Sequence, residues 1–266
     1  MELYKLTAEQ AAADLHVLYR YAPWNPYTID VITHQHLYLA SASQMNDEWE
    51  FRIPYVHHND LIGTLEDMFQ GQSANFTEDD VLIEEPFQDQ NGVLHEADVQ
   101  VINSDRDNIG IACFSNCENN PMMWYHYADK YRGICLEFTN IFGETTNGIE
   151  GVVGPVSYGD YPHIDIVSQA RLDPQHIALM YRYFHKSTTW QQEHEYRYIT
   201  YICDGRSRYF PFGDTVLTAI YCGFRMSPCD IQLVYDLAML YNRSVAVYTS
   251  ALGENDFGFT FSRYEP

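Results

Sequence analysis

Hydrophobic and polar positions along the chain predict an alternation of short helices and strands. Residues 8–17 are rich in helix formers, and the aromatic segment 18–21 that follows is typical of a short strand ending at a proline-rich breaker. We expect Thr28 to cap a short helix over residues 29–35, which leads into a strand over residues 36–40. The chain therefore opens as helix, strand, short helix, strand.

Residues 55–108 are the least patterned part of the chain, because turn-forming and acidic residues interrupt every apolar run. We interpret this segment as a variable insertion or lid. The pattern returns after it, with apolar runs that predict strands and amphipathic runs that predict helices. The strands are expected at 109–115, 133–138, 195–203, 216–222, 244–249 and 257–263, and the helices at 121–130, 171–186 and 229–241. This mixture predicts an α+β fold.

Composition agrees with a single domain over residues 1–266, since 266 residues with 46% hydrophobic content can bury one substantial core. The N-terminus lacks the pattern of a signal peptide, and no apolar run is long enough for a membrane span. The 6 cysteines show no C-x-x-C spacing, which favours buried thiols over a disulfide framework. We expect a soluble, cytoplasmic protein with no membrane partner.

The formal charge of −22 changes the range of expected partners. Binding to nucleic acid depends on neutralising phosphates with Lys and Arg, so non-specific nucleic-acid binding is disfavoured. Aromatic residues reach 15% of the chain, and tyrosine-rich surfaces line ligand clefts as well as β-sheet cores. A local basic groove stays open as an alternative, because Arg197, Arg206 and Arg208 fall in short segments.

The common signatures of metal and phosphate sites are missing. The 11 histidines form no H-E-x-x-H pattern, and neither a Walker loop nor a G-x-G-x-x-G follows a strand. We expect no metal cofactor.

One segment places two carboxylates close together. On a strand, Glu193 and Glu195 share one face, with His194 on the other, and two such groups in a cleft can stabilise a cationic sugar. The alternatives are a solvated strand face, or an ion pair of either glutamate with Arg197, which shares that face.

Two further polar residues lie in or at the end of predicted strands. Arg20 lies between Tyr19 and Tyr21, where its guanidinium can stack on the rings or form a bidentate contact with a phosphate or ribose. The alternative is that Arg20 is an exposed strand residue. Ser115 ends a buried strand and can offer its hydroxyl to the same site.

The helix expected at residues 121–130 presents Trp124, Tyr127 and Ala128 on one face, which indicates core packing. His126 points away from that face and is available for function.

Several blocks resemble a widespread bacterial family of unknown function. The family pattern contains L-Y-[KR]-Y, N-D-x-[WF]-E, C-F-S, M-W-x-H-Y-A-D-x-x-x-G-[IV]-C-L-x-F and K-x-x-x-W-x-x-E-x-E-[YW]-R. The matching segments here are Leu18–Tyr21, Met45–Phe51, Cys113–Ser115, Met123–Phe138 and Lys186–Arg197. The resemblance supplies no activity, but it adds Asn46 and Arg197 to the candidate binding residues.

The order Arg20, Ser115, Glu195 is also similar to the R-S-E signature of ADP-ribosyltransferases. That resemblance implies a mixed, mostly antiparallel split sheet flanked by helices, with NAD as substrate. Arg20 would hold an NAD phosphate or ribose, Ser115 would brace the nicotinamide ribose, and Glu195 would bind the ribose 2′-hydroxyl. Glu193 would orient the acceptor, which is unknown. Tyr19, Tyr21 or Trp124 would stack on nicotinamide.

Two other functions stay open. The chain can be a non-catalytic sensor or interaction module, for example in phage defence, that binds a nucleotide-type small molecule without turnover. The acids of the segment 47–50 can also bind Mg²⁺ in a phosphodiesterase, although no basic groove accompanies them.

Overall fold

The computed structural model describes residues 15–47, 50–51, 108–142, 152–159, 183–202, 207–242, 244–254 and 258–266. The chain divides into two compact units, which we describe separately. The first comprises residues 1–40, 110–156 and 189–266, and the second comprises residues 41–109 and 157–188. The insertion or lid predicted at 55–108 lies outside the described residues, apart from residue 108.

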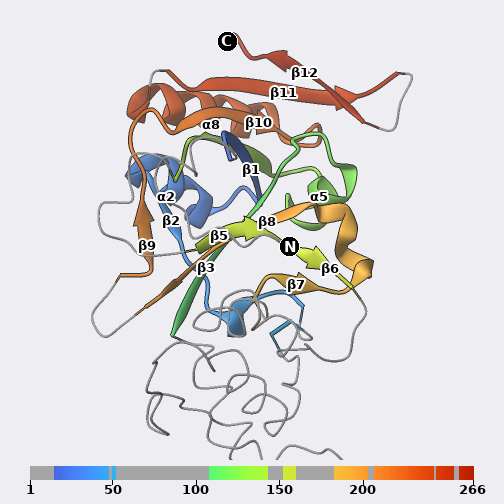
Figure 1. Cartoon of the computed structure of the whole chain (residues 1–266). Coiled ribbons are helices and arrows are strands. Elements are labelled where there is room, and N and C mark those ends of the chain that lie inside the picture. The colour runs from blue at the N-terminus through green and yellow to red at the C-terminus, as the bar shows by residue number, and fades with distance from the viewer. Residues whose placement is uncertain are drawn as a thin grey trace, which may run out of the picture. The chain divides into compact units, whose positions relative to one another are not determined.

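A large mixed sheet dominates the first unit and gives it the α+β architecture expected from the sequence (Figure 1). Its strand order is β12-β11-β10-β4-β1-β3-β8-β5. The pair β10–β11 is parallel, whereas β1–β3, β1–β4, β10–β4, β11–β12 and β5–β8 are antiparallel. The strands are β1 (Val17–Ala22), β3 (Ile109–Ser115), β4 (Ile134–Thr139), β5 (Val152–Pro155), β8 (Glu195–Tyr201), β10 (Leu217–Cys222), β11 (Ala246–Leu252) and β12 (Phe259–Arg263).

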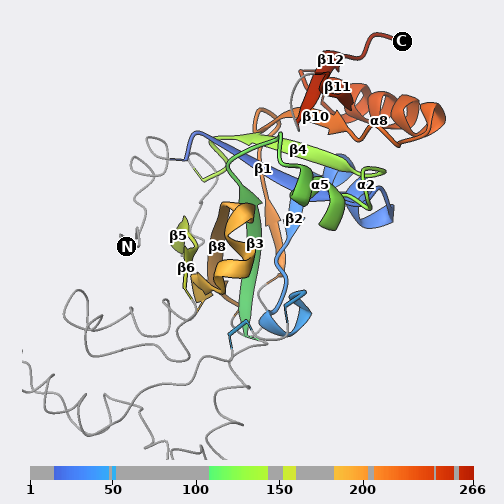
Figure 2. The same cartoon turned by 90° about the vertical axis from the view of Figure 1, so that its right-hand side faces the viewer.

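The two faces of this sheet are covered differently. Helices α2 (Pro26–His34) and α8 (Pro228–Tyr241) contact each other, and α8 runs along β11 (Figure 2). Their buried residues join the main hydrophobic core with the alternate strand residues that face them. The short helix α5 (Pro121–His126) packs on the other face and forms a second, aromatic cluster.

Strand β1 contributes to both clusters because successive side chains point to opposite faces. Leu18 belongs to the main core, whereas Tyr21 belongs to the aromatic cluster with Tyr19 packed beside it. The central place of β1, between β3 and β4, confirms the strand predicted at residues 18–21.

Helix boundaries differ from the sequence expectations at two points. Asn25, not Thr28, caps α2, because its Oδ1 accepts from the Thr28 backbone N–H at 3.1 Å. Helix α5 ends at His126 instead of residue 130, since Asp129, Lys130 and Tyr131 all have positive φ.

Gly133 explains why the chain turns so tightly after α5. A Cβ atom on this residue would lie 2.2 Å from the Ala22 carbonyl oxygen, so only glycine permits this approach to β1. The backbone N–H of Gly133 donates to the Ala128 carbonyl and closes the turn.

Two other predicted helices lie mainly outside the described residues. The helix expected at residues 8–17 does not extend to residue 17, because Val17 is the first residue of β1. Of the helix expected at 171–186, the last two residues form β7 (His185–Lys186), so the helix does not extend to Lys186. These residues are held instead by parallel pairing with β6 (Ser157–Tyr158).

The second unit contains a buried ion pair near β7. Lys186 Nζ lies 3.1 Å from Glu50 Oε1, and the side chains are only 2% and 1% exposed. The ring of Phe51 packs on Tyr183 with centroids 5.0 Å apart. This unit also holds the 3-10 turn η1 (Ala42–Gln44), and the exposed Asn46 follows it.

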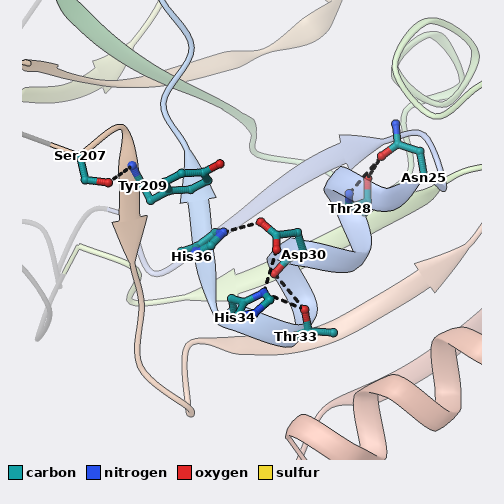
Figure 3. A network of polar contacts seen from close by, with 8 residues as sticks. All are labelled: Asn25, Thr28, Asp30, Thr33, His34, His36, Ser207 and Tyr209. Atoms are coloured by element: carbon teal, nitrogen blue, oxygen red, sulfur yellow. Dashed lines mark hydrogen bonds and ion pairs between the residues drawn. The ribbon is translucent and has the colours of Figure 1, made fainter.

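A polar network joins α2 to the small sheet of β2 (His36–Tyr38) and β9 (Tyr209–Pro211) (Figure 3). The Asp30 carboxylate lies between two histidines, with Oδ1 2.7 Å from His34 Nδ1 and Oδ2 2.7 Å from His36 Nε2. The His36 ring also packs on Tyr209, with centroids 4.4 Å apart. Asp30 therefore ties the helix to the strand that follows it.

Replacing Asp30 by asparagine is expected to give a pH-dependent loss of stability. The hydrogen bond from His36, followed by the charges of the two histidines, lowers the pKa of Asp30. A carboxylate whose pKa is lower in the folded state than in the unfolded state stabilises the fold at pH values above its unfolded-state pKa of about 4. This stabilisation is lost as the pH falls through the folded-state pKa. Because Asp30 is 39% exposed, we expect a loss of at most about 1 kcal/mol at neutral pH.

Urea unfolding at neutral pH and near pH 3 measures this effect. Asp236→Asn is the matched control, since Asp236 is an exposed helical residue that accepts a hydrogen bond from Gln232. A difference between wild type and Asp30→Asn that stays constant down to pH 3 would contradict the assignment.

Along the part of the chain that the structure describes, no helix is long and apolar enough to cross a membrane. The described cysteines are free thiols, as expected, but of these five only Cys135 and Cys222 are buried, whereas Cys113 and Cys117 are half-buried and Cys229 is exposed.

Candidate functional site

Several predicted site residues meet where β3 ends, beside α5 and the 3-10 helix η2 (Thr188–Glu193). Ser115 is the Cα partner of Tyr19 on β1 and is fully buried. Its hydroxyl donates to the Glu193 backbone carbonyl at 2.9 Å. The Tyr127 hydroxyl donates to Glu193 Oε1. The fold thus brings Tyr19, Ser115 and Glu193 together and fixes Glu193 through both its backbone and its carboxylate.

Glu193 does not share a strand with Glu195, contrary to the expectation from the sequence. It is the last residue of η2, and β8 begins only at Glu195. His194 between them has φ 46°, a left-handed conformation that interrupts the extended backbone. Simple alternation therefore cannot place the two carboxylates on one strand face.

Glu195 forms a buried ion pair with Arg197, the alternative left open by the sequence. Arg197 Nε donates to Oε1 at 2.7 Å, and Nη2 donates to Oε2 at 2.9 Å. Arg197 is fully buried and Glu195 is 5% exposed. Both carboxylate oxygens are thus engaged by the planar fork of one guanidinium.

The aromatic residues expected to stack on a ligand are mostly used inside the protein. Trp124 is 1% exposed, and its ring packs edge-on against Tyr21 at 5.4 Å. The Tyr21 hydroxyl donates to the Cys117 carbonyl at 2.7 Å. Tyr19 is half-buried, and His126 is exposed with its ring 6.4 Å from that of Trp190. Trp124 packs in the aromatic cluster, as its helix face predicts.

Arg20 lies on the other face of β1. Tyr19 and its partner Ser115 share one face of the sheet, so the next residue, Arg20, leaves the strand on the opposite face, which Leu18 shares. The fold therefore separates Arg20 from Ser115 instead of bringing them together.

The Arg20 guanidinium is poorly solvated. The residue is half-buried, but its Nη1 atom is inaccessible to solvent and finds no hydrogen-bond partner among the residues that the structure describes. Burial lowers the pKa of this guanidinium, and the nearby Cys113 thiol opposes that shift. Burying a guanidinium is unfavourable unless its donors are satisfied, and among the described residues Nη1 is not.

Sequence reasoning missed a glutamate on the aromatic face. Glu137 on β4 accepts from Thr218 Oγ1 at 2.7 Å through Oε1 and from the Tyr221 hydroxyl at 2.7 Å through Oε2. Its position in the strand predicted at 133–138, flanked by apolar residues, was the available signal. Asn46 belongs to the second unit and is described only there.

Among the described residues, no group of three or more His, Cys, Asp or Glu is arranged to hold a metal ion. Glu50, one of the acids considered for Mg²⁺, contacts Lys186 instead.

Comparison with known proteins adds no further constraint. The chain has no significant match to a protein-family model, to a curated protein or to a solved structure.

Proposed function

We propose that this protein binds a small phosphate-bearing molecule of the nucleotide type, with Arg20 as the residue that contacts the phosphate. The observation that carries the proposal is the buried Nη1 of Arg20, which has no hydrogen-bond partner among the described residues. A guanidinium donates two parallel hydrogen bonds to phosphate oxygens, and a phosphate would supply the acceptor that Nη1 lacks among the described residues.

The charge of the chain favours a small ligand over a polymer. A formal charge of −22 repels an extended polyanion, whereas a single phosphate needs only one local cation. The ligand class is therefore a nucleotide or dinucleotide, and not a nucleic acid.

ADP-ribosyl transfer from NAD is the second candidate, and the cluster of Ser115 and Glu193 favours it. Such a reaction needs the catalytic carboxylate to reach the nicotinamide ribose. Glu195 is held by Arg197, and Arg20 faces away from Ser115, so the geometry supports binding better than transfer. Nicotinamide release from NAD by wild type and Glu195→Gln separates the two functions, because a binder without turnover releases only background amounts in both.

Replacing Arg20 by methionine is expected to abolish ligand binding and to stabilise the protein. Methionine fills a similar volume without the unpaired charge, so we expect the free energy of unfolding to rise by about 1–3 kcal/mol. In thermal unfolding with NAD, ADP-ribose, AMP or inorganic phosphate, the wild type should gain about 2.7 kcal/mol at a ligand concentration near 100 Kd. The variant should gain nothing.

Arg263→Met provides the control, because Arg263 is an exposed strand arginine on β12 and its loss should leave both stability and binding unchanged. Arg20→Lys keeps the positive charge but loses the planar guanidinium that can donate two parallel hydrogen bonds. We expect weaker binding without the gain in stability. Equal binding by wild type and Arg20→Met would contradict the proposal.

A further inference from the structure

A row of half-buried aromatic rings crosses the sheet face opposite the main core. We call Tyr19, Glu137, Tyr221, Tyr248 and Phe261 the tyrosine–glutamate face; they come from β1, β4, β10, β11 and β12. Tyr221 stacks on Tyr248 with centroids 5.0 Å apart, and its ring lies 4.9 Å from Phe261 and 6.4 Å from Tyr19. The rings form one continuous aromatic surface.

The Glu137 carboxylate lies within this surface. Glu137 is the Cα partner of Tyr19 on one side and of Ala219 on the other, so it projects among the rings. In the described part of the chain, its carboxylate forms hydrogen bonds with hydroxyl groups but no ion pair. The negative charge is therefore held in place without being neutralised.

A second carboxylate, that of Glu118, adds to the negative charge near these rings. Burial is the main cause that raises the pKa of Tyr19, and the charges of Glu118 and Glu137 raise it further. The pKa of Tyr221 is raised by burial and by its hydrogen bond to Glu137, with a smaller contribution from Glu118. Both tyrosines consequently stay neutral, and their electron-rich rings lie beside two anionic groups.

This combination selects a cation over a neutral ligand. Aromatic ring faces attract cations through their quadrupole, and a desolvated carboxylate strengthens that attraction. Each Glu137 oxygen already accepts one hydroxyl hydrogen bond, from Thr218 or Tyr221, which leaves fewer acceptor positions for the hydroxyl groups of a neutral sugar. A cation needs none of these positions, because charge and ring surface attract it.

We propose that the tyrosine–glutamate face binds a small organic cation, of the quaternary ammonium or methylated amine class. This site is independent of the phosphate site proposed above, because Arg20 leaves β1 on the opposite face from Tyr19. Failure of either proposal leaves the other intact.

The test compares choline with its neutral isostere, 3,3-dimethylbutan-1-ol, by titration calorimetry. The wild type should bind choline about tenfold more tightly than the isostere, and added salt should weaken only choline binding. Glu137→Gln should weaken choline binding about tenfold and leave the isostere unchanged. Equal affinities for the two probes, or no choline binding at millimolar concentration, would overturn the proposal.

A second variant keeps the test decisive if Glu137→Gln does not fold. Tyr248→Leu removes one ring from a half-buried edge of the surface and should weaken choline binding severalfold. Tyr241→Leu is the matched control, because Tyr241 is an exposed tyrosine at the end of α8, outside this face. Equal losses in Tyr248→Leu and Tyr241→Leu would overturn the assignment to this face.

Discussion

Replacing Arg197 by methionine is expected to lower the free energy of unfolding by about 3–5 kcal/mol. Arg197 is fully buried, and both of its contacts to Glu195 are short, at 2.7 and 2.9 Å. Without the guanidinium, the Glu195 carboxylate loses a counter-charge in a site where it is only 5% exposed, and a buried charge is unfavourable there.

Urea unfolding of three variants separates these contributions. Arg197→Met combined with Glu195→Leu should recover most of the loss, since the double variant removes both charges of this pair. Arg132→Met breaks the exposed pair between Arg132 and Asp129, which are 58% and 47% exposed, and should leave stability almost unchanged. A loss below 1 kcal/mol for Arg197→Met would show that Glu195 is solvated and available for chemistry.

Replacing Lys186 by methionine should have a similar effect in the second unit, again about 3–5 kcal/mol. Lys186 and Glu50 are almost completely buried and 3.1 Å apart, so the variant removes a counter-charge from a buried carboxylate. The two residues come from separate blocks of the sequence, Met45–Phe51 and Lys186–Arg197. Their pairing gives these two blocks a shared structural role.

The control for this variant is Lys130→Met, which removes an exposed lysine and should change stability by less than about 0.5 kcal/mol. The double variant Glu50→Gln with Lys186→Met should recover part of the loss. If added Mg²⁺ raises the free energy of unfolding of Lys186→Met, the cation binds near Glu50. The acids of the segment 47–50 would then again be a candidate metal site.

The sequence predicts the longer strands of the main sheet where a local apolar pattern encodes them, but it missed β5, which belongs to that sheet, and the short strands β6, β7 and β9. Apolar runs such as 109–115 and 216–222 appear as β3 and β10 with little change at their ends. The end of α5 could not be predicted, since it depends on the close approach of Gly133 to Ala22, which lies on a distant strand. A local sequence pattern cannot predict a contact with a distant strand.

The candidate site was predictable only where it depends on neighbours in the sequence. The pair of Glu195 and Arg197 follows from their spacing on one strand, and it is confirmed. Glu137 was overlooked because its partners Thr218 and Tyr221 are 81 and 84 residues away and meet it only through the register of β4 and β10. The faces of Arg20 and Ser115 likewise depend on which residue of β1 pairs with β3.

The central position of β1 makes the sheet depend on its earliest described strand. Residues 17–22 lie between β3 and β4, which are otherwise not neighbours in the strand order. A fragment without them would expose a hydrogen-bonding edge on β3 and another on β4, each a template for pairing with a second chain. During synthesis β1 emerges long before β4, so its hydrogen-bonding groups must remain without these partners until both sides of the sheet are available.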